Sequence, residues 1–221
     1  MKIMNFNKEF KNYNSNAITQ KSVAEKLLTL IDQNKKYNSI LELGCGTGIF
    51  TEYIVKNLNF NTLDLNDIFD TREFFSYINY SNFFIENMES LTLKKYSLIL
   101  SSSAFQWVDN FEKLIEKISK STDYLVFSIY SKGNLIEIFN HFGVTLKYHS
   151  TEEIKNILKK YFKEISFEED TFVLEFPTPL AALKHLKKTG VTGFQKSSYS
   201  LTKSFNSTLL TYKISYFSCK K

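Results

Sequence analysis

Three glycines stand at alternate positions directly after a short apolar segment, in the run Ile40-Leu41-Glu42-Leu43-Gly44-Cys45-Gly46-Thr47-Gly48. Glycine has no Cβ, so a glycine-rich backbone can turn sharply and lie against a ligand without a clash. From Thr47 to Val55 the apolar residues then recur at helical spacing. A strand, a glycine loop and the first turn of a helix together form a ligand cleft in open α/β sheets. We therefore predict that this loop holds a small ligand.

The pattern of the loop separates three kinds of ligand. It lacks the Gly-Lys-Ser/Thr with which P-loop proteins hold a triphosphate and Mg²⁺. It also departs from the G-x-G-x-x-G of dinucleotide-binding proteins, whose third glycine allows close helix packing over a pyrophosphate. The remaining pattern resembles the E/D-x-G-x-G-x-G loop of class I S-adenosylmethionine (SAM) methyltransferases, although a simple glycine turn is the alternative. The cofactor-binding residues that this resemblance implies are Glu42, Gly44, Cys45, Gly46 and Gly48.

A second predicted strand, Phe60 to Leu65, carries a carboxylate near its end. Asp64 lies about twenty residues beyond the glycines, which is the spacing of a ribose-binding acid. A carboxylate at the carboxyl edge of a strand can accept hydrogen bonds from two neighbouring hydroxyls. We therefore predict Asp64 and Leu65 as part of a ribose site. We interpret Asp67 and Asp70, which follow, as first-turn acids favoured by a helix dipole.

Composition limits the class of protein. A chain of 221 residues with 43% hydrophobic content can bury one sizeable core, so we expect one domain. No apolar run reaches the roughly 18 residues that span a bilayer, and the start of the chain lacks the apolar segment of a signal peptide. Only Cys45 and Cys219 are present, so a disulfide framework is not expected. These features predict a cytoplasmic protein with reduced thiols and no membrane partner.

Charge is distributed unevenly along the chain. All 23 acidic residues precede Pro177, so the last 45 residues carry +8 and the first 176 carry −3. Lys184, Lys187 and Lys188 stand at i, i+3 and i+4 and would share one side of a helix. A solvated lysine-rich surface is one interpretation of these residues. The absence of acids over such a long stretch favours the other, which is an acidic partner.

Helix and strand patterns alternate along the first 130 residues. We predict a helix over 17–31 and strands at 39–43, 60–65, 82–85, 97–101 and 124–129. Such alternation predicts a parallel sheet with right-handed crossovers and helices on both faces. Farther on we expect helices near 134–141 and 152–161, a strand over 165–175, a helix from 177 to about 188, and a last edge strand over 209–217.

Two further loops follow predicted strands. After the third strand, in the segment Glu86 to Leu91, methyltransferases of this class carry an acid that accepts from the adenine amino group. Asn87 occupies that place, and its side-chain oxygen can also accept a hydrogen bond. Met88 beside it could flank the adenine or pack in the core. The segment Ser101 to Asp109 follows the fourth strand, where open α/β sheets bind substrates, and it contains the only tryptophan of the chain.

Segments along almost the whole chain resemble the malonyl-acyl-carrier-protein O-methyltransferases of biotin synthesis. They are Phe10-Lys11-Asn12-Tyr13 with Gln20, the glycine loop, Thr62-Leu63-Asp64-Leu65, Met88-Glu89-Ser90-Leu91, Ser103-Ala104-Phe105-Gln106-Trp107, Gly133-Asn134-Leu135, Ser150 to Ile154, Ala182 to Gly193, and Leu210-Thr211-Tyr212. The glycine loop alone indicates a methyltransferase. The Gln106-Trp107 loop and the segment Leu186 to Gly193 indicate this family.

The resemblance implies a Rossmann-like class I methyltransferase fold in one domain over residues 1–221. Its seven-stranded, mostly parallel sheet would have helices on both faces and a small helical cap. Residues 1–35 would form a lead-in or lid helix, residues 36–130 the SAM-binding core, and residues 131–221 the substrate and cap region. The implied cofactor is S-adenosyl-L-methionine, and Ser103 is a further candidate for its site.

The resemblance also implies transfer of a methyl group to the free carboxylate of a malonyl thioester on acyl carrier protein. A carboxylic acid with a pKa near 4 is more than about 99% ionised at neutral pH, so no general base is expected. Candidates for positioning the substrate are Tyr13, Phe105, Gln106 and Trp107; Lys132 and Lys147 are candidates for binding its carboxylate or the carrier's phosphopantetheine phosphate. Lys184, Lys187 and Lys188 would dock the acidic carrier protein.

Two other functions stay open at this point. One is methylation of a small free carboxylic acid, which would need no basic docking face. The other is a SAM-binding partner protein without catalysis. Nucleic-acid methylation is disfavoured because no Asn-Pro-Pro-Tyr or Asp-Pro-Pro-Tyr motif is present. The histidines His141, His149 and His185 have no metal-ligand spacing, so no metal is expected.

Overall fold

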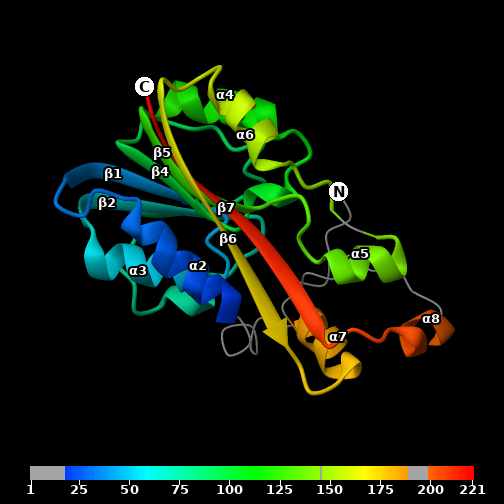
Figure 1. The fold of residues 1–221 in the computed structure, drawn as a ribbon. Helices are drawn as coiled ribbons and strands as arrows, with labels where there is room; N and C mark the ends of the chain where they lie inside the picture. Colours follow the sequence, from blue (N-terminus) through cyan, green and yellow to red (C-terminus); the bar gives the residue numbers. More distant parts are fainter. Residues whose placement is uncertain (1–17, 145, 189–198) are drawn as a thin grey trace.

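The computed structural model describes residues 18–144, 146–188 and 199–221, and within them seven strands form one sheet (Figure 1). The strand order is β3-β2-β1-β4-β5-β7-β6. β1 to β5 are parallel to their neighbours, whereas β7 runs antiparallel to both β5 and β6. The bounds are β1 (Lys36–Leu43), β2 (Asn59–Asp67), β3 (Asn82–Ile85), β4 (Leu98–Ser102), β5 (Tyr124–Tyr130), β6 (Glu164–Glu175) and β7 (Leu209–Lys220). The expected mostly parallel sheet is confirmed.

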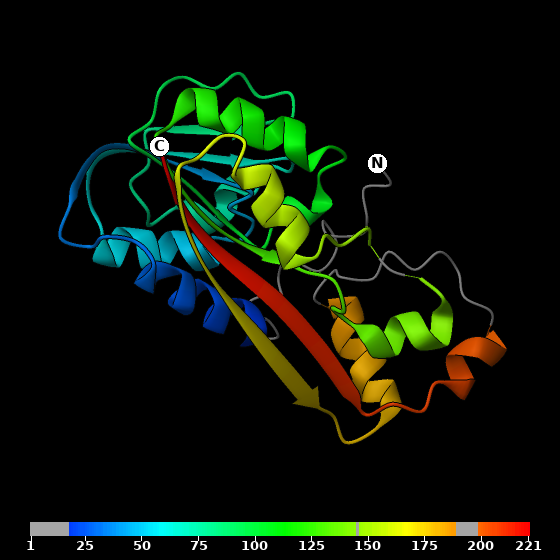
Figure 2. The same cartoon turned by 45° about the horizontal axis from the view of Figure 1, so that its top comes forward.

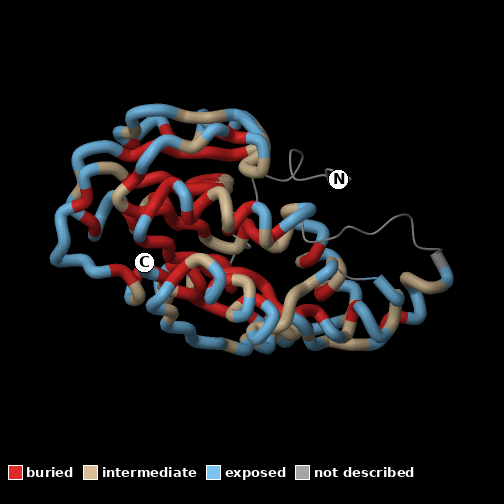
Figure 3. The backbone as a smooth tube through the Cα atoms, turned by 90° about the horizontal axis from the view of Figure 1, so that it is seen from above, coloured by how far each residue is buried: buried red, intermediate tan, exposed pale blue. Residues whose placement is uncertain are grey.

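Helices cover both faces of the sheet. α2 (Ile18–Thr29) and α3 (Ile49–Asn57) pack on one face through side chains such as Val23, Leu27 and Ile54, which are fully buried. α4 (Phe111–Ser121) and α6 (Thr151–Leu158) pack on the other face through Ile115, Ile118 and Ile154. Figure 3 shows the buried backbone concentrated between exposed outer segments. Alternate residues of each strand therefore supply two separate cores.

The expected helical cap lies at one end of the sheet. It contains α5 (Ile136–Phe142), α7 (Pro179–Lys188) and α8 (Tyr199–Ser204). Figure 2 shows the long β6–β7 ribbon extending from the body of the sheet, with α7 beside its far end. Short 3₁₀ helices, η1 (Arg72–Phe75) and η2 (Phe105–Trp107), follow β2 and β4. No helix among the described residues has both the length and the apolar character needed to cross a membrane.

The last strand does not lie where the sequence predicts. β7 is placed between β5 and β6, so the prediction of an edge strand over 209–217 is wrong. Residues 214–217 are buried in succession because both faces of β7 are covered. β6 is the edge strand instead, and it carries the exposed acids Glu168 and Glu169. Charged residues on an edge strand discourage pairing with another chain.

Candidate cofactor and substrate site

The glycine loop joins β1 to α3 at the carboxyl edge of the sheet. Gly44, Gly46 and Gly48 have φ values of +73°, +53° and +86°, a backbone conformation that residues with a side chain rarely adopt. A Cβ on Gly44 would stand 2.4 Å from the Cβ of Ala104 and 3.3 Å from the Cε of Met88, whereas a Cβ on Gly46 would meet no heavy atom within 4 Å. Gly44 therefore lets two loops approach, and Gly46 presents bare backbone to open space. We call this glycine loop the cradle; its bare backbone allows a small ligand to approach closely.

The end of β2 holds the loop in place. The backbone oxygen of Asn66 accepts hydrogen bonds from the amides of Gly44 (2.8 Å) and Cys45 (2.9 Å). Asp67, the last residue of β2, accepts from the Gly46 amide at 2.8 Å and from the Phe69 amide at 3.0 Å. Burial raises the pKa of Asp67, although these backbone hydrogen bonds oppose the shift. A buried carboxylate therefore stands directly beside the glycine loop.

Asp64 does not occupy that position. β2 continues to Asp67, so the predicted strand over 60–65 ends too early, and the interpretation of Asp67 as a helical first-turn acid is wrong. Asp64 is 1% exposed, and its carboxylate accepts from Asn82 Nδ2 (2.8 Å) and Tyr96 OH (2.9 Å) and pairs with Lys94 Nζ (2.8 Å). Burial alone would raise the pKa of Asp64, but these partners outweigh it and lower the pKa.

The neighbours predicted with Asp64 have other positions as well. Leu65 is fully buried in the core on the α2–α3 side of the sheet. Asp70 precedes η1 and pairs with the guanidinium of Arg72 at 2.6 Å, which holds the pKa of Asp70 at about 2. The acid beside the glycine loop is instead Asp67, which the sequence pattern does not single out as a ligand-binding residue.

Glu42 carries a carboxyl group inside the protein. It is 1% exposed, and its Oε2 accepts from the Thr51 hydroxyl of α3 at 2.6 Å. Burial, with a further contribution from Asp67, raises the pKa of Glu42 to about 8, while the Thr51 hydrogen bond opposes the shift. Burial and the same two acids also raise the pKa of the Cys45 thiol. The Glu42 carboxyl is therefore mainly protonated at neutral pH. A positively charged ligand nearby would lower its pKa and favour the carboxylate.

The loop after β3 has a defined turn. Asn87 Oδ1 accepts from the Glu89 amide at 2.9 Å, and its backbone oxygen accepts from the amides of Ser90 and Leu91 at 3.0 Å each. An amide oxygen has two lone pairs, so Asn87 keeps capacity for one further donor. Met88, beside it, is half-buried and directs its terminal methyl toward Gly44. The loop after β3 therefore lies next to the glycine loop, as the sequence predicts.

The loop after β4 contains strained and unpaired groups. Ser103 has a φ of +53°, and its amide donates to the hydroxyl of Ser128 at 3.0 Å. Gln106 Nε2 donates to the backbone oxygen of Ser103. Among the described residues, Ser103 Oγ and Gln106 Oε1 are buried without a hydrogen-bond partner. Buried unpaired polar atoms are uncommon, and a strained backbone at the sheet edge is typical of ligand sites.

The aromatic residues of this loop have different positions. Phe105 is 1% exposed and packs against Phe111 and Phe127, with ring centroids 6.3 Å and 5.1 Å away. It therefore supports the loop from the core, which does not fit the predicted pocket wall. Trp107 is half-buried at the end of η2. Tyr13, the fourth candidate, lies outside the described residues.

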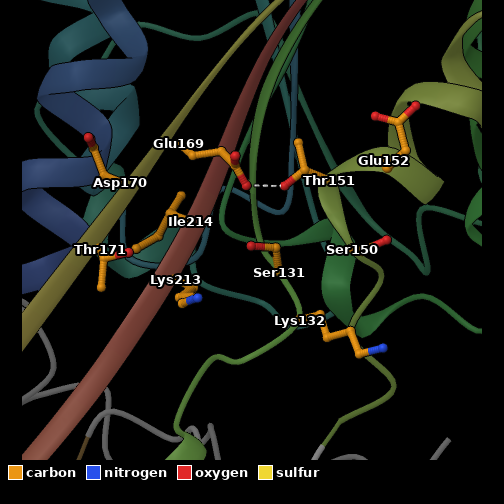
Figure 4. Close-up of a pocket in the computed structure, with 10 residues that line it drawn as sticks. All are labelled: Ser131, Lys132, Ser150, Thr151, Glu152, Glu169, Asp170, Thr171, Lys213 and Ile214. Atoms are coloured by element: carbon orange, nitrogen blue, oxygen red, sulfur yellow. Dashed lines mark hydrogen bonds between the residues drawn. The ribbon is translucent and has the colours of Figure 1, made fainter.

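A cavity of about 460 Å³ lies beyond the end of β5, between the β6–β7 ribbon and the start of α6. Its lining residues are Ser131, Lys132, Ser150, Thr151, Glu152, Glu169, Asp170, Thr171, Lys213 and Ile214. In Figure 4 the Lys132 ammonium points away from the centre, and Glu169 faces Thr151. Three carboxylates outnumber the two lysines, so the cavity as a whole does not favour an anion. Lys147, the other predicted cation, is exposed and is not part of this lining.

The lysines of α7 share an exposed side of the helix. Lys184, Lys187 and Lys188 are exposed, whereas Ala182 and Leu186 are fully buried against the core. The predicted amphipathic helix is therefore confirmed. No group of three His, Cys, Asp or Glu side chains in the described ranges could hold a metal ion.

Comparison with known proteins adds three findings. A family model described as a methyltransferase domain matches residues 15–161. The malonyl-[acyl-carrier protein] O-methyltransferase of Calditerrivibrio nitroreducens is 35% identical over 98% of this chain and 95% of its own length, and that of Bacteroides thetaiotaomicron is 30% identical over 87% and 78%. The solved N-methyltransferase NodS of Bradyrhizobium japonicum, in complex with S-adenosyl-L-homocysteine, shares the fold with a TM-score of 0.59 at 13% identity, over 97% and 96%.

The sheet order, the glycine cradle and the family match define a class I, SAM-dependent methyltransferase. Within that class, the chain belongs to the family of malonyl-[acyl-carrier protein] O-methyltransferases, which the resemblance in the sequence predicts.

Proposed function

We propose that this chain transfers the methyl group of SAM to the free carboxylate of a malonyl thioester carried on acyl carrier protein, an early step of biotin synthesis. The observation that carries the proposal is the 35% identity to a protein of that name over 98% of this chain. The glycine loop at the carboxyl edge of the sheet supports it, because Gly44 lets the loop after β4 approach and Gly46 leaves open space for a ligand there.

The proposal assigns the cofactor to residues at the ends of β1 to β4. Bound SAM supplies a methyl group activated by a sulfonium charge. Gly44, Cys45, Gly46 and Gly48 form the cradle, and Glu42 below it becomes charged when a cation binds above. Asp67, rather than Asp64, accepts the ribose hydroxyls because its carboxylate ends β2 beside the Gly46 amide at 2.8 Å. Asn87 and Met88 bind the adenine.

The acceptor needs orientation rather than activation. The malonyl carboxylate is ionised at neutral pH, so no residue of the chain has to remove a proton. One carboxylate oxygen forms a bond to the methyl carbon as the carbon–sulfur bond breaks, and opposite charges cancel. Ser103, Gln106 and Trp107 orient the carboxylate and exclude water, which favours a reaction in which charge disappears. Tyr13 is a further proposed wall of the pocket.

We propose that the carrier protein docks on the cap region, residues 131–221. Lys184, Lys187 and Lys188 form one exposed side of α7, to which the acidic helix of a carrier can dock. Lys132 and Lys147 are exposed within this region, and we assign them to the phosphate of the phosphopantetheine arm or to the malonyl carboxylate. Residues 36–130 bind the cofactor in this division, and residues 1–35 supply the lead-in helix, of which α2 packs on the sheet.

The experiment is methyl transfer from labelled SAM to malonyl-acyl-carrier protein, with acetyl-acyl-carrier protein and free malonate in parallel. Label on the malonyl carrier alone supports the proposal. Label on free malonate would favour a small-acid methyltransferase instead. SAM binding without transfer to any acid would favour a partner protein without catalysis.

A charge reversal tests the docking surface. Changing Lys184, Lys187 and Lys188 to glutamate should raise the KM for the malonyl carrier about tenfold or more, because electrostatic docking is reversed. The KM for a malonyl-pantetheine thioester should stay within twofold. The matched control changes three other exposed lysines, Lys36, Lys159 and Lys163, to glutamate. Equal effects of the two triple variants on the carrier would show that net charge, rather than α7, is responsible.

A further inference from the structure

Lys117 extends from the middle of α4 to the backbone of the loop after β3. Its Nζ donates hydrogen bonds to the carbonyl oxygens of Met88 (2.6 Å), Glu89 (2.9 Å) and Leu91 (2.9 Å). An ammonium has three donors, and all three are used here. The side chain is half-buried, and burial lowers the pKa of Lys117 despite the nearby carboxylates of Glu86 and Glu89. The Lys117 ammonium therefore binds the backbone of the loop instead of water.

Glu89 connects the same loop to α4 in the opposite direction. Its two carboxylate oxygens accept from the backbone amides of Asp109 (3.0 Å) and Asn110 (2.9 Å). Asn110 is the N-cap of α4, so the carboxylate lies at the positive end of the helix dipole. The loop after β3 is thus joined to α4 both at the start of the helix and near its middle.

These contacts link the two halves of the site. The loop after β3 contains Met88, whose methyl lies against Gly44 of the cradle. α4 follows directly on the segment 103–108, which contains the unpaired oxygens of Ser103 and Gln106. A shift of α4 would therefore move the loop after β3, and with it one wall of the cradle.

We propose that Lys117 and Glu89 are positioning residues that fix the loop 86–91 in the conformation that binds the cofactor. Lys117 fixes the backbone of Met88 and so the distance between its side chain and Gly44. Glu89 fixes the position of the loop relative to the segment 103–108, which orients the acceptor. The inference rests on the proposed cofactor site, and it assigns to α4 a role in cofactor affinity although no residue of α4 is expected to contact the cofactor.

The alternative is that the two side chains only stabilise the fold. A purely structural role would lower the unfolding midpoint but leave the affinity of the folded protein unchanged. A positioning role weakens cofactor binding selectively, because a loop free to adopt other conformations binds with an affinity reduced by the fraction of molecules in the competent one.

The experiment measures binding of S-adenosyl-L-homocysteine by calorimetry and both KM values by methyl transfer. Lys117→Met keeps the length and apolar stem of the side chain but removes the three donors. We expect about a tenfold rise in the dissociation constant and in the KM for SAM, and a KM for the malonyl carrier within twofold. The control is Lys120→Met on the same helix, since Lys120 is exposed and its ammonium pairs with Glu116 of the same helix. We expect wild-type binding from it.

Glu89 provides a second, independent arm. Glu89→Ala should raise the dissociation constant several-fold, and Glu89→Gln should recover part of the loss because its amide oxygen can accept from one of the two backbone amides. If Lys117→Met does not fold, Lys117→Gln, which keeps two donors on a shorter chain, replaces it with a smaller rise expected.

The outcomes separate the inference from the proposed function. Wild-type affinity in folded Lys117→Met and Glu89→Ala proteins would overturn the inference while leaving the methyltransferase intact. Equal weakening by Lys120→Met would also overturn it, because the effect would then be one of charge. If the wild-type chain itself did not bind S-adenosyl-L-homocysteine, both the inference and the proposed function would fall.

Discussion

Glu42 links the folding of this protein to pH. Burial raises its pKa from an ordinary value of 4.5 to about 8, and the hydrogen bond from Thr51 does not restore it. An acid with a folded pKa above its unfolded value stabilises the fold fully below about pH 4.5, and this contribution is lost as the pH rises through about 8. Each pKa unit corresponds to about 1.4 kcal/mol, so the loss across this window is on the order of 5 kcal/mol.

Glu42→Gln should remove this dependence. The glutamine amide can still accept from the Thr51 hydroxyl but binds no proton. The free energy of unfolding of wild type should therefore exceed that of the variant by more near pH 5 than near pH 8. The measurement is urea unfolding of the ligand-free protein between pH 5 and 8, with Glu116→Gln, a partly exposed acid of α4, as the control. A difference between wild type and Glu42→Gln that is constant with pH would contradict the role of this carboxyl.

Asp67 and Asp64 should respond in opposite ways to the same substitution. Asp67→Asn should weaken S-adenosyl-L-homocysteine binding about tenfold, because an amide offers one acceptor oxygen where the carboxylate offers two charged ones. Asp64→Asn should leave binding within twofold but lower the free energy of unfolding by about 1–3 kcal/mol, because the partners Lys94 and Tyr96 lose a buried charge. Calorimetry and urea unfolding measure the two quantities. Weakened binding by Asp64→Asn alone would return the ribose to Asp64.

At the level of strands and loops, the features that depend on local sequence could be predicted. The glycine cradle was predictable because its positive φ values exclude most other residues at Gly44, Gly46 and Gly48. The five parallel strands were predictable because hydrophobic runs alternate with helical patterns. Strand ends were not, since they depend on pairing: β2 continues to Asp67 because Asp67 pairs with Ile85 of β3.

The order of the last two strands was misjudged, although the sequence contains a signal for it. Ile214, Tyr216 and Phe217 lie in a run buried on both faces, which is typical of an interior strand. The consecutive acids Glu168, Glu169 and Asp170 of β6 are typical of an edge strand. Lys117 and Glu89 carry no such signal, because their partners lie about twenty or more positions away and only the fold brings them together.

For the molecule as a whole, the cofactor cradle and the basic helix α7 lie at different places along the carboxyl side of the sheet, because β6 runs parallel to β1–β5 and α7 follows it. The cofactor cradle lies at the carboxyl edge of β1 to β4, whereas α7 lies beside the far end of the β6–β7 ribbon (Figure 2). The last 45 residues carry +8 and no acid, while acids are gathered on earlier elements such as β6. The exposed lysines of α7 are thus the basic surface that a docked carrier protein would meet.

This separation predicts different salt dependences for the two substrates. Exposed charges are screened over about 10 Å at 0.1 M salt, so docking of an acidic carrier on exposed lysines should weaken as salt increases. Between 50 and 300 mM salt, roughly the range over which such screening develops, the KM for malonyl-acyl-carrier protein should rise several-fold. The KM for a malonyl-pantetheine thioester should change little, because that substrate lacks the acidic surface. An equal rise of both KM values would show that salt acts on the buried site and not on docking to α7. With the Lys184, Lys187 and Lys188 to glutamate variant the salt dependence should reverse, so that the KM for the carrier falls as salt increases, because salt then screens a repulsion between like charges.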